Sequence, residues 1–276
     1  MLVGVLLVTL AAASWGTWSL FLVPTHLPWI VTSALVFAMM GLAALPFVRG
    51  RVAWDRRLVT LLLLNTAFDA LNIVTFFAAM ANTTVAIAVL THYAAPIIIA
   101  LAAPRIDRVS ARGVGPAAAV ALIGLVVVLE PWQTQADGAL VGGALGLVSA
   151  CCYAGNVFCV RRLAGSIGAI RALSYHSLIA AAILLPFAAS GLSAVTGADL
   201  GYLAAGSVTI GAVSGVVYAV GLLRIGSARS AVLTFAEPLV AVAVGALWWH
   251  QPLHPIAAVG GALVIGAGVY VARRAQ

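Results

Sequence analysis

The chain has 276 residues, of which 64% are hydrophobic and only 8% are charged, with a formal net charge of +7. Soluble domains carry about 25% charged and about 45–50% apolar residues, so this composition excludes an ordinary soluble protein. A transmembrane helix needs about 20 apolar residues to cross a bilayer. The composition therefore predicts an all-α integral membrane protein with short loops and no separate soluble domain.

Long apolar runs recur along the whole chain and predict ten transmembrane helices. The first run ends in small residues like those before a signal-peptide cleavage site, but no basic segment precedes it, so we expect a retained helix. In chain order, the predicted spans cover residues 3–22, 29–48, 58–78, 83–103, 112–130, 139–160, 171–189, 200–222, 228–248 and 255–272.

All basic residues are arginines, and they lie only in alternate loops and after the last span. They are Arg49, Arg51, Arg56, Arg57, Arg105, Arg108, Arg112, Arg161, Arg162, Arg171, Arg224, Arg229, Arg273 and Arg274. The positive-inside rule places this face, with both termini, in the cytoplasm. The basic charge thus indicates topology in a lipid bilayer and argues against a nucleic-acid partner. The Ala- and Arg-rich, Lys-free composition suggests a bacterial cytoplasmic (inner) membrane.

The two halves of the chain resemble each other. A shift of 142 residues aligns TTVAIAVLTHYAAP (83–96) with IGSARSAVLTFAEP (225–238). A shift of 138 residues aligns Trp15 with Tyr153. We therefore expect a five-helix repeat over 1–130, an external linker over 131–138 and a second repeat over 139–276. Because five is odd, the second repeat enters the membrane from the opposite side. Such inverted repeats are typical of transporters with a central midplane site.

Several segments of the chain resemble the EamA-type drug/metabolite transporter superfamily. They are Trp15-Gly16, the block FFAAMANTTVAIAVLTHYAAP, its echo VYAVGLLRIGSARSAVLTFAEPLVAVAVGAL and the closing GGALVIGAGVYV. The resemblance implies a ten-helix exporter of small metabolites, nearest to bacterial exporters of aromatic amino acids. One departure is the stretch Trp248–Pro252, which lacks the Gly-Glu pair often found after the ninth span.

A polar stripe marks one face of the third predicted span. Asn65, Asp69, Asn72 and Phe76 are spaced by four, three and four residues, so they share a helix face. At the 142-residue shift they align with Ser207, Gly211, Ser214 and Tyr218. A polar stripe should not face lipid, so both faces are expected to point inward. Asn72, Phe76 and Tyr218 are candidate substrate contacts, whereas interhelical hydrogen bonding alone is an equal alternative for Asn65 and Ser207.

Glu237 and Asp69 are the carboxylates expected inside the membrane, where a charge is costly and faces a cavity or a partner. Glu237 has three candidate roles, which are proton exchange, binding of a substrate amine, and a static hydrogen bond. Asp69 and His92 are further candidates for proton coupling, and His92 is also a candidate substrate contact. Pro96 and Pro238 are candidate hinges, because each removes a backbone donor and displaces the carbonyl four residues earlier.

Deep aromatic side chains complete the candidate site. Rings on opposing helices can hold a flat or cationic substrate by stacking or cation–π contacts, with core packing as the alternative. These residues, with one amide on the same face as Tyr153, are Trp15, Tyr93, Tyr153, Phe235 and Asn156.

No sequence motif indicates an enzyme. The chain lacks G-x-S-x-G, H-E-x-x-H and any metal-ligand spacing, so no cofactor or metal is expected. The leading hypothesis is a secondary transporter that exports amino acids through a midplane site. The alternatives are an exporter of cationic drugs or other metabolites, and a channel-like facilitator. Ten helices can enclose a cavity without a second copy, so a monomer would suffice.

Overall fold

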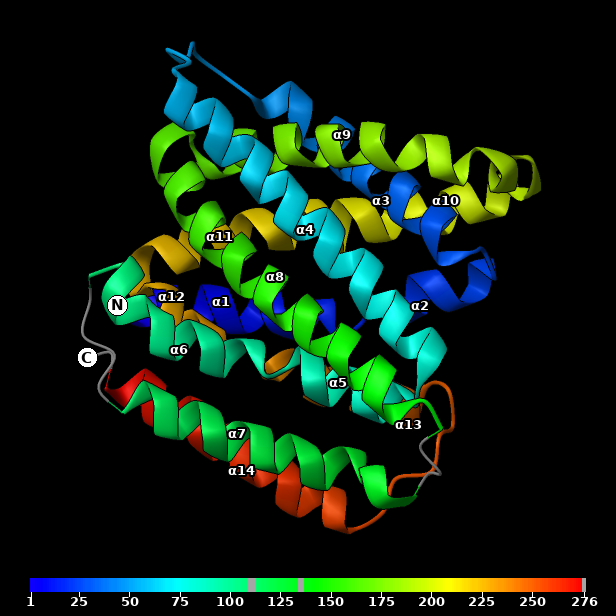
Figure 1. The fold of residues 1–276 in the computed structure, drawn as a ribbon, viewed down its shortest axis with the longest axis vertical. Helices are drawn as coiled ribbons and strands as arrows, with labels where there is room; N and C mark the ends of the chain where they lie inside the picture. The colour runs from blue at the N-terminus through cyan, green and yellow to red at the C-terminus, as the bar shows by residue number, and fades with distance from the viewer. Residues whose placement is uncertain (109–112, 134–136, 275–276) are drawn as a thin grey trace.

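The computed structural model describes residues 1–108, 113–133 and 137–274. Within these residues, ten helical spans are long and apolar enough to cross a membrane, and none of the residues forms a strand. This confirms the predicted all-helical membrane fold (Figure 1). Arg112 and part of the predicted 131–138 linker lie outside the described residues.

The first five spans occupy the amino-terminal half of the chain. Their elements are α1 (Leu2–Trp15), α2 (Ser19–Leu22), η1 (Val23–Thr25), α3 (Trp29–Ala44), η2 (Leu45–Phe47), α4 (Arg56–Asn82), α5 (Val85–His92), α6 (Ala95–Ile106), α7 (Val114–Leu129) and η3 (Pro131–Gln133). The first span is interrupted by a turn at residues 16–18, and the fourth between α5 and α6.

The second five spans follow the same order. Their elements are α8 (Ala139–Ile167), α9 (Ala169–Ala188), η4 (Ala189–Ala194), α10 (Gly197–Gly206), η5 (Ser207–Val213), α11 (Ser214–Ile225), α12 (Ser227–Leu233), α13 (Ala236–Leu247) and α14 (Ile256–Arg273). η5 is a π-helical segment within the eighth span, and such segments are frequent at functional sites.

The fourth and ninth spans are interrupted at equivalent positions. α5 ends at His92 and α6 begins at Ala95, whereas α12 ends at Leu233 and α13 begins at Ala236. Pro96 and Pro238 thus occupy the first turns of the restarted helices, where a missing N–H is tolerated. The two breaks are related by the 142-residue spacing of the sequence.

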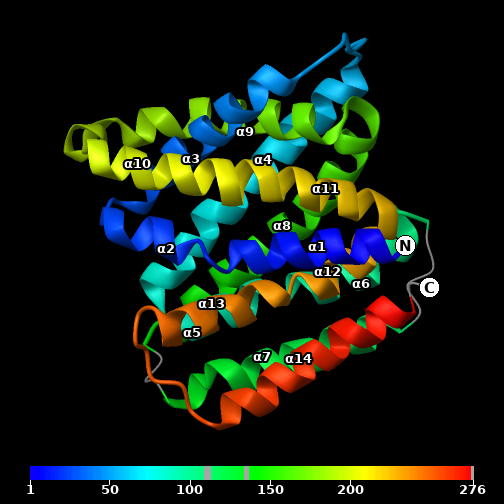
Figure 2. The ribbon, with the colours of Figure 1, turned by 180° about the vertical axis from the view of Figure 1, so that it is seen from behind.

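The most extensive helix contacts join the two halves of the chain. They are α4 with α8, α3 with α9, α7 with α14, and α1 with α11, while α6 contacts α12 across the centre. Figures 1 and 2 show these pairs from opposite sides. The α7–α14 pair is especially close, because a Cβ atom on Gly260 would lie 2.4 Å from the carbonyl oxygen of Gly124.

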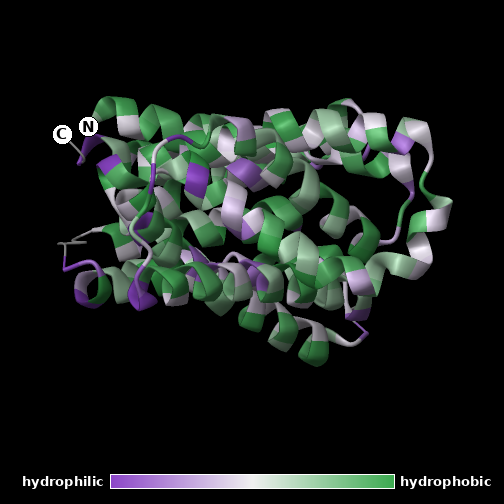
Figure 3. Cartoon of the chain, turned by 90° about the horizontal axis from the view of Figure 1, so that it is seen from above, coloured by the Kyte–Doolittle hydropathy of each residue, from purple (hydrophilic) through white to green (hydrophobic). Residues whose placement is uncertain are grey.

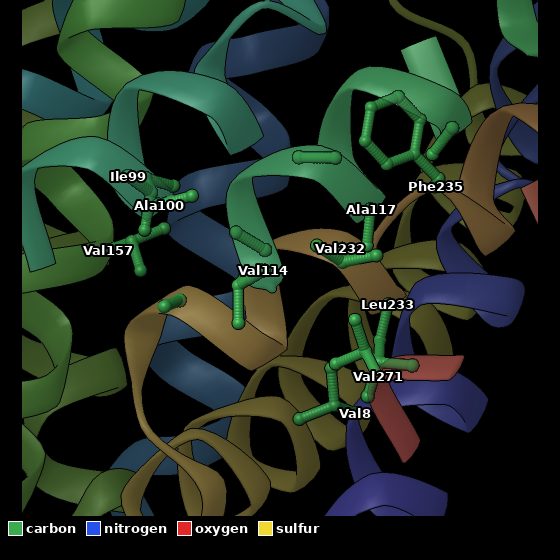
Figure 4. Packing of buried hydrophobic residues seen from close by; sticks show 14 of the residues in the cluster. Val8, Ile99, Ala100, Val114, Ala117, Val157, Val232, Leu233, Phe235 and Val271 are labelled. Carbon is green, nitrogen blue, oxygen red and sulfur yellow. The ribbon is translucent and has the colours of Figure 1, made fainter. Parts of the chain in front are cut away.

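The main hydrophobic core also draws on both halves. Figure 4 shows that Val8, Ile99 and Val114 of the first half lie in the same cluster as Phe235 and Val271 of the second half. The outer surface is equally apolar, with Leu140 87% and Leu247 81% exposed. Exposed apolar surface on this scale is expected where helices face lipid rather than water.

Both termini lie at one end of the molecule. The α3–α4, α8–α9 and α11–α12 connections lie at that end too, as do the end of α6 and the start of α7 (Figure 1). Hydrophilic residues gather toward this end, whereas hydrophobic residues dominate the helices (Figure 3). The arginines that fall within the described residues therefore mark a single face of the bundle.

Candidate functional site

A small cavity lies where the two broken spans meet. Residues from both halves form it, and six of the seven flank the breaks between α5 and α6 and between α12 and α13. The lining residues are His92, Tyr93, Ala95, Pro96, Tyr153, Thr234 and Glu237. The predicted site residues His92, Tyr93, Tyr153 and Glu237 and the predicted hinge Pro96 are thus brought together around one space.

Glu237 is the carboxylate that lines this cavity, and the side chains of Tyr93 and Tyr153 interact with it electrostatically. The phenol of Tyr93 faces the carboxylate directly. No arginine belongs to the lining. The cavity therefore offers one acidic group, two phenols and one imidazole, a combination suited to a protonated amine attached to a flat body.

Aromatic rings surround His92 on several sides. Its ring centroid lies 4.8 Å from that of Phe76 and 5.4 Å from those of Tyr93 and Tyr153. Tyr93 in turn contacts Phe235, with centroids 5.5 Å apart. Because these rings come from α4, α5, α8 and the α12–α13 break, they fix the relative positions of four helical elements around the cavity.

The orientation of the His92 ring is fixed by a polar chain across three helices. Nδ1 of His92 lies 2.8 Å from Oγ of Ser149 on α8. The Ser149 hydroxyl also lies 2.8 Å from Oδ1 of Asn72 and 3.1 Å from its carbonyl oxygen, both on α4. Ser149 was not among the predicted site residues. It precedes Tyr153 and Asn156 by four and seven residues, so these three residues share one helix face.

We expect Ser149→Ala to lower the free energy of unfolding by about 1 kcal/mol, because His92 and Asn72 each lose a buried hydrogen-bond partner. Thermal unfolding in detergent measures this effect. The matched control is Ser166→Ala, since the hydroxyl of Ser166 donates only to the carbonyl of Arg162 near the end of the same helix. Equal stability of the two variants would contradict a role for Ser149 in holding His92.

The other predicted contacts lie around the cavity rather than on its lining. Asn72 contacts Ser149, which in turn contacts the lining residue His92, and Phe76 packs against His92 directly. Trp15 packs on Tyr218 with ring centroids 4.9 Å apart, and both lie between α1 and α11. Phe235 is fully buried. The amide of Asn156 lies 3.4 Å from Oδ1 of Asn65, which joins α8 to α4.

One expected consequence of Pro238 is wrong. The carbonyl of Thr234 is not free, because it accepts the backbone N–H of Glu237 at 3.0 Å. The Thr234 hydroxyl donates to the carbonyl of Ala231 at 2.7 Å. The chain tightens into a short turn before α13 and satisfies these groups locally. The carboxylate of Glu237 is then the polar group of this turn that the local backbone does not use.

Asp69 lies outside the lining and has a different partner. Its Oδ2 atom lies 3.0 Å from Nε2 of His176 on α9, a residue 107 positions away along the chain. Among the described residues, no three His, Cys, Asp or Glu side chains form a group that could hold a metal ion.

Comparison with known proteins gives consistent results. Residues 140–273 match the EamA-like transporter family. A protein of Archaeoglobus fulgidus described as an uncharacterized transporter is 29% identical over 270 residues, which cover 97% of this chain and 95% of that protein. One solved crystal structure covers 98% of both chains with a TM-score of 0.85 at 19% identity, which supports the fold alone. The second half of the chain is thus similar to the EamA-like transporter family, and the whole chain is similar to a protein described as a transporter.

Proposed function

We propose that this protein is a secondary transporter that exports small amine-bearing metabolites, above all aromatic amino acids, by alternating access at the cavity between its halves. The observation that carries the proposal is the position of the cavity. It lies at the breaks of the fourth and ninth spans, contains a carboxylate and is lined from both halves. Interrupted helices around a midplane site are typical of secondary transporters.

The helix pairing supports an inverted repeat of residues 1–130 and 139–276. In such a repeat, the first span corresponds to the sixth, the second to the seventh, and so on. α1 of the first span then corresponds to α8 of the sixth, and α11 of the eighth span corresponds to α4 of the third. The α1–α11 contact therefore corresponds to the α8–α4 contact. Under the same exchange, the α3–α9, α6–α12 and α7–α14 contacts each map onto themselves. This invariance is expected for two halves related by a two-fold axis in the membrane plane. Rocking of one half against the other would then expose the cavity to each side in turn.

We further propose that the protein works as a monomer in the bacterial cytoplasmic membrane. The Arg-bearing end and both termini would face the cytoplasm. One chain already supplies both walls of the cavity.

The lining chemistry also supports a second candidate substrate class. An amino acid carries a carboxylate that a basic group would neutralise, but no arginine lines the cavity. A cationic drug or a simple aromatic amine would need only Glu237 and the surrounding rings. These cations are therefore the alternative to amino acids.

Transport by the purified protein in proteoliposomes tests the proposal. The panel would contain labelled phenylalanine, tyrosine and tryptophan, their decarboxylated amines, and a quaternary ammonium cation. Saturable uptake with substrate-stimulated exchange supports alternating access, whereas fast uptake that does not saturate would indicate a channel. Preference for the amines over the amino acids would favour the second substrate class. No movement of any panel member by folded protein would contradict both.

A further inference from the structure

We propose that Asp69 and His176 form a proton-binding pair, separate from the substrate cavity, that couples proton entry to substrate export. The proposal rests on the transport function above. It differs from a role for Glu237, because neither member of the pair lines the cavity.

The geometry of His176 requires a shared proton. Nδ1 lies 3.0 Å from the carbonyl oxygen of Ala172, and Nε2 lies 3.0 Å from Oδ2 of Asp69. A carbonyl only accepts hydrogen bonds, so Nδ1 must donate. Nε2 then either donates to a carboxylate as part of an imidazolium, or accepts from a protonated Asp69. Both forms contain the same number of protons and have zero net charge.

Loss of that proton would change the contact between two helices. The pair would then carry one negative charge, and the lone pair of Nε2 would face the carboxylate. Both outcomes are unfavourable inside a membrane, where a charge without a partner costs several kcal/mol. Because Asp69 belongs to α4 and His176 to α9, deprotonation weakens a contact between the two halves of the chain. Movement between the halves is the motion that alternating access requires.

The fold does not need an ionic pair to join these helices. The corresponding contact in the other half brings α3 against η5. There Gly211, which aligns with Asp69 at the 142-residue spacing, packs against Met40, and a Cβ atom on Gly211 would lie 2.6 Å from Cγ of Met40. The two contacts join equivalent helices, yet one is apolar and the other contains two titratable groups. A purely structural role therefore leaves the choice of Asp and His unexplained.

The pair is reachable by protons and adjacent to the substrate site. The side chain of Asp69 is 19% exposed, whereas that of His176 is 8% exposed and packs edge-on against Phe37 of α3, with ring centroids 6.2 Å apart. Tyr153 lines the cavity and interacts electrostatically with both Glu237 and Asp69. The pair is therefore electrostatically close to the substrate cavity.

Other titratable or charged groups also occur on α4, on α9 and on the helices that pack against them. α3 contains none between Trp29 and Ala44, and Arg171 is engaged by the carbonyls of Ile167 and Gly50. The remaining ones are Arg56 and Arg57 on α4, Tyr175 on α9, Cys151, Cys152, Tyr153, Cys159, Arg161 and Arg162 on α8, Tyr218 and Arg224 on α11, and His92 on α5. Tyr153 is close enough to Asp69 to interact with it electrostatically.

The first test measures the protonation of His176 directly. Nitrogen NMR of histidine-labelled protein in lipid nanodiscs follows the five histidines across a pH series, and His176→Gln identifies the signal of His176. We expect Asp69→Asn to move the titration midpoint of that signal, because the two groups share a proton. An unchanged midpoint would overturn the proposal.

The second test measures coupling in proteoliposomes, with tyrosine and tyramine as probes. A gradient of about one pH unit can drive about tenfold accumulation per proton exchanged. We expect Asp69→Asn, His176→Gln and the double variant to lose this accumulation but to keep substrate exchange at equal pH within about twofold of wild type. The matched control is His26→Gln, which replaces an exposed histidine outside the pair and should retain full accumulation.

The double variant separates coupling from structure, because its two amides can still form a hydrogen bond between α4 and α9 without a titratable proton. Retained accumulation in this variant would overturn the proposal. Equal loss of accumulation and exchange would also overturn it, since that result indicates a structural role. If wild-type protein moves neither probe, the proposed transport of these substrates fails, and the NMR midpoint still decides whether the pair holds a proton.

Discussion

Glu237→Gln is expected to weaken binding of an aromatic amine or amino acid by about 10-fold to 100-fold, because a hydrogen bond to a charged group contributes about 1.5–3 kcal/mol. Glu237 supplies the negative charge of the cavity lining, so the glutamine variant leaves a protonated amine without a counter-charge. Glutamine has nearly the same shape, so the fold should be retained. Competition binding and initial transport rates in proteoliposomes measure the effect.

The control for this substitution is Glu130→Gln. Glu130 lies at the end of α7, where its Oε2 atom is 3.3 Å from Nδ1 of His254, away from the cavity. We expect the Glu130→Gln variant to bind the aromatic amine or amino acid within about twofold of wild-type affinity, since the charge of Glu130 does not face the substrate. Wild-type affinity in the Glu237 variant, with protein shown to be folded, would exclude the amine-binding role.

Gly16→Ala is expected to lower the free energy of unfolding by about 1–3 kcal/mol, as overpacking of a tight contact does, and to reduce transport strongly. Gly16 ends α1, and a Cβ atom there would lie 2.4 Å from the carbonyl oxygen of Glu237 and 2.8 Å from the backbone nitrogen of Ala241. Both are backbone atoms that no side-chain rotation can move. The methyl group therefore separates α1 from α13 beside the cavity.

Gly201→Ala on α10 is the matched control, because no atom would lie within 4 Å of its added methyl group. Alanine favours a helix over glycine, so this variant should be neutral or slightly more stable. Thermal unfolding in detergent and transport rates report both effects. Equal stability and equal transport rates of the two alanine variants would contradict a role in transport for the close approach of α1 to the ninth span.

Local sequence features were sufficient for much of the architecture. Apolar run length predicted the ten spans, because crossing hydrocarbon imposes a minimum length on every helix. The aligned prolines, predicted as hinges, lie in the first turn after each of two helix breaks, where a residue without a backbone donor is tolerated. The spacing of Asn65, Asp69, Asn72 and Phe76 placed them on one face, as helical geometry requires.

The partners of these residues could not be predicted in the same way. The four residues share a face of α4, yet Asn65 contacts Asn156, Asn72 contacts Ser149, and Asp69 contacts His176. These contacts join positions 77 to 107 residues apart. Helical periodicity gives the direction of a side chain relative to its own axis, but not the identity of the neighbouring helix.

Taken by itself, the sequence determined that this protein has ten apolar spans and that its arginines gather at alternate span ends. Those properties depend on composition and on spacing along one chain segment. Only the tertiary structure decided that His92, Tyr93, Tyr153 and Glu237 line a common cavity while Trp15 and Tyr218 pack beside it. The physical reason is that helix rotation and close approach, as at Gly16, are set by packing between segments distant in sequence.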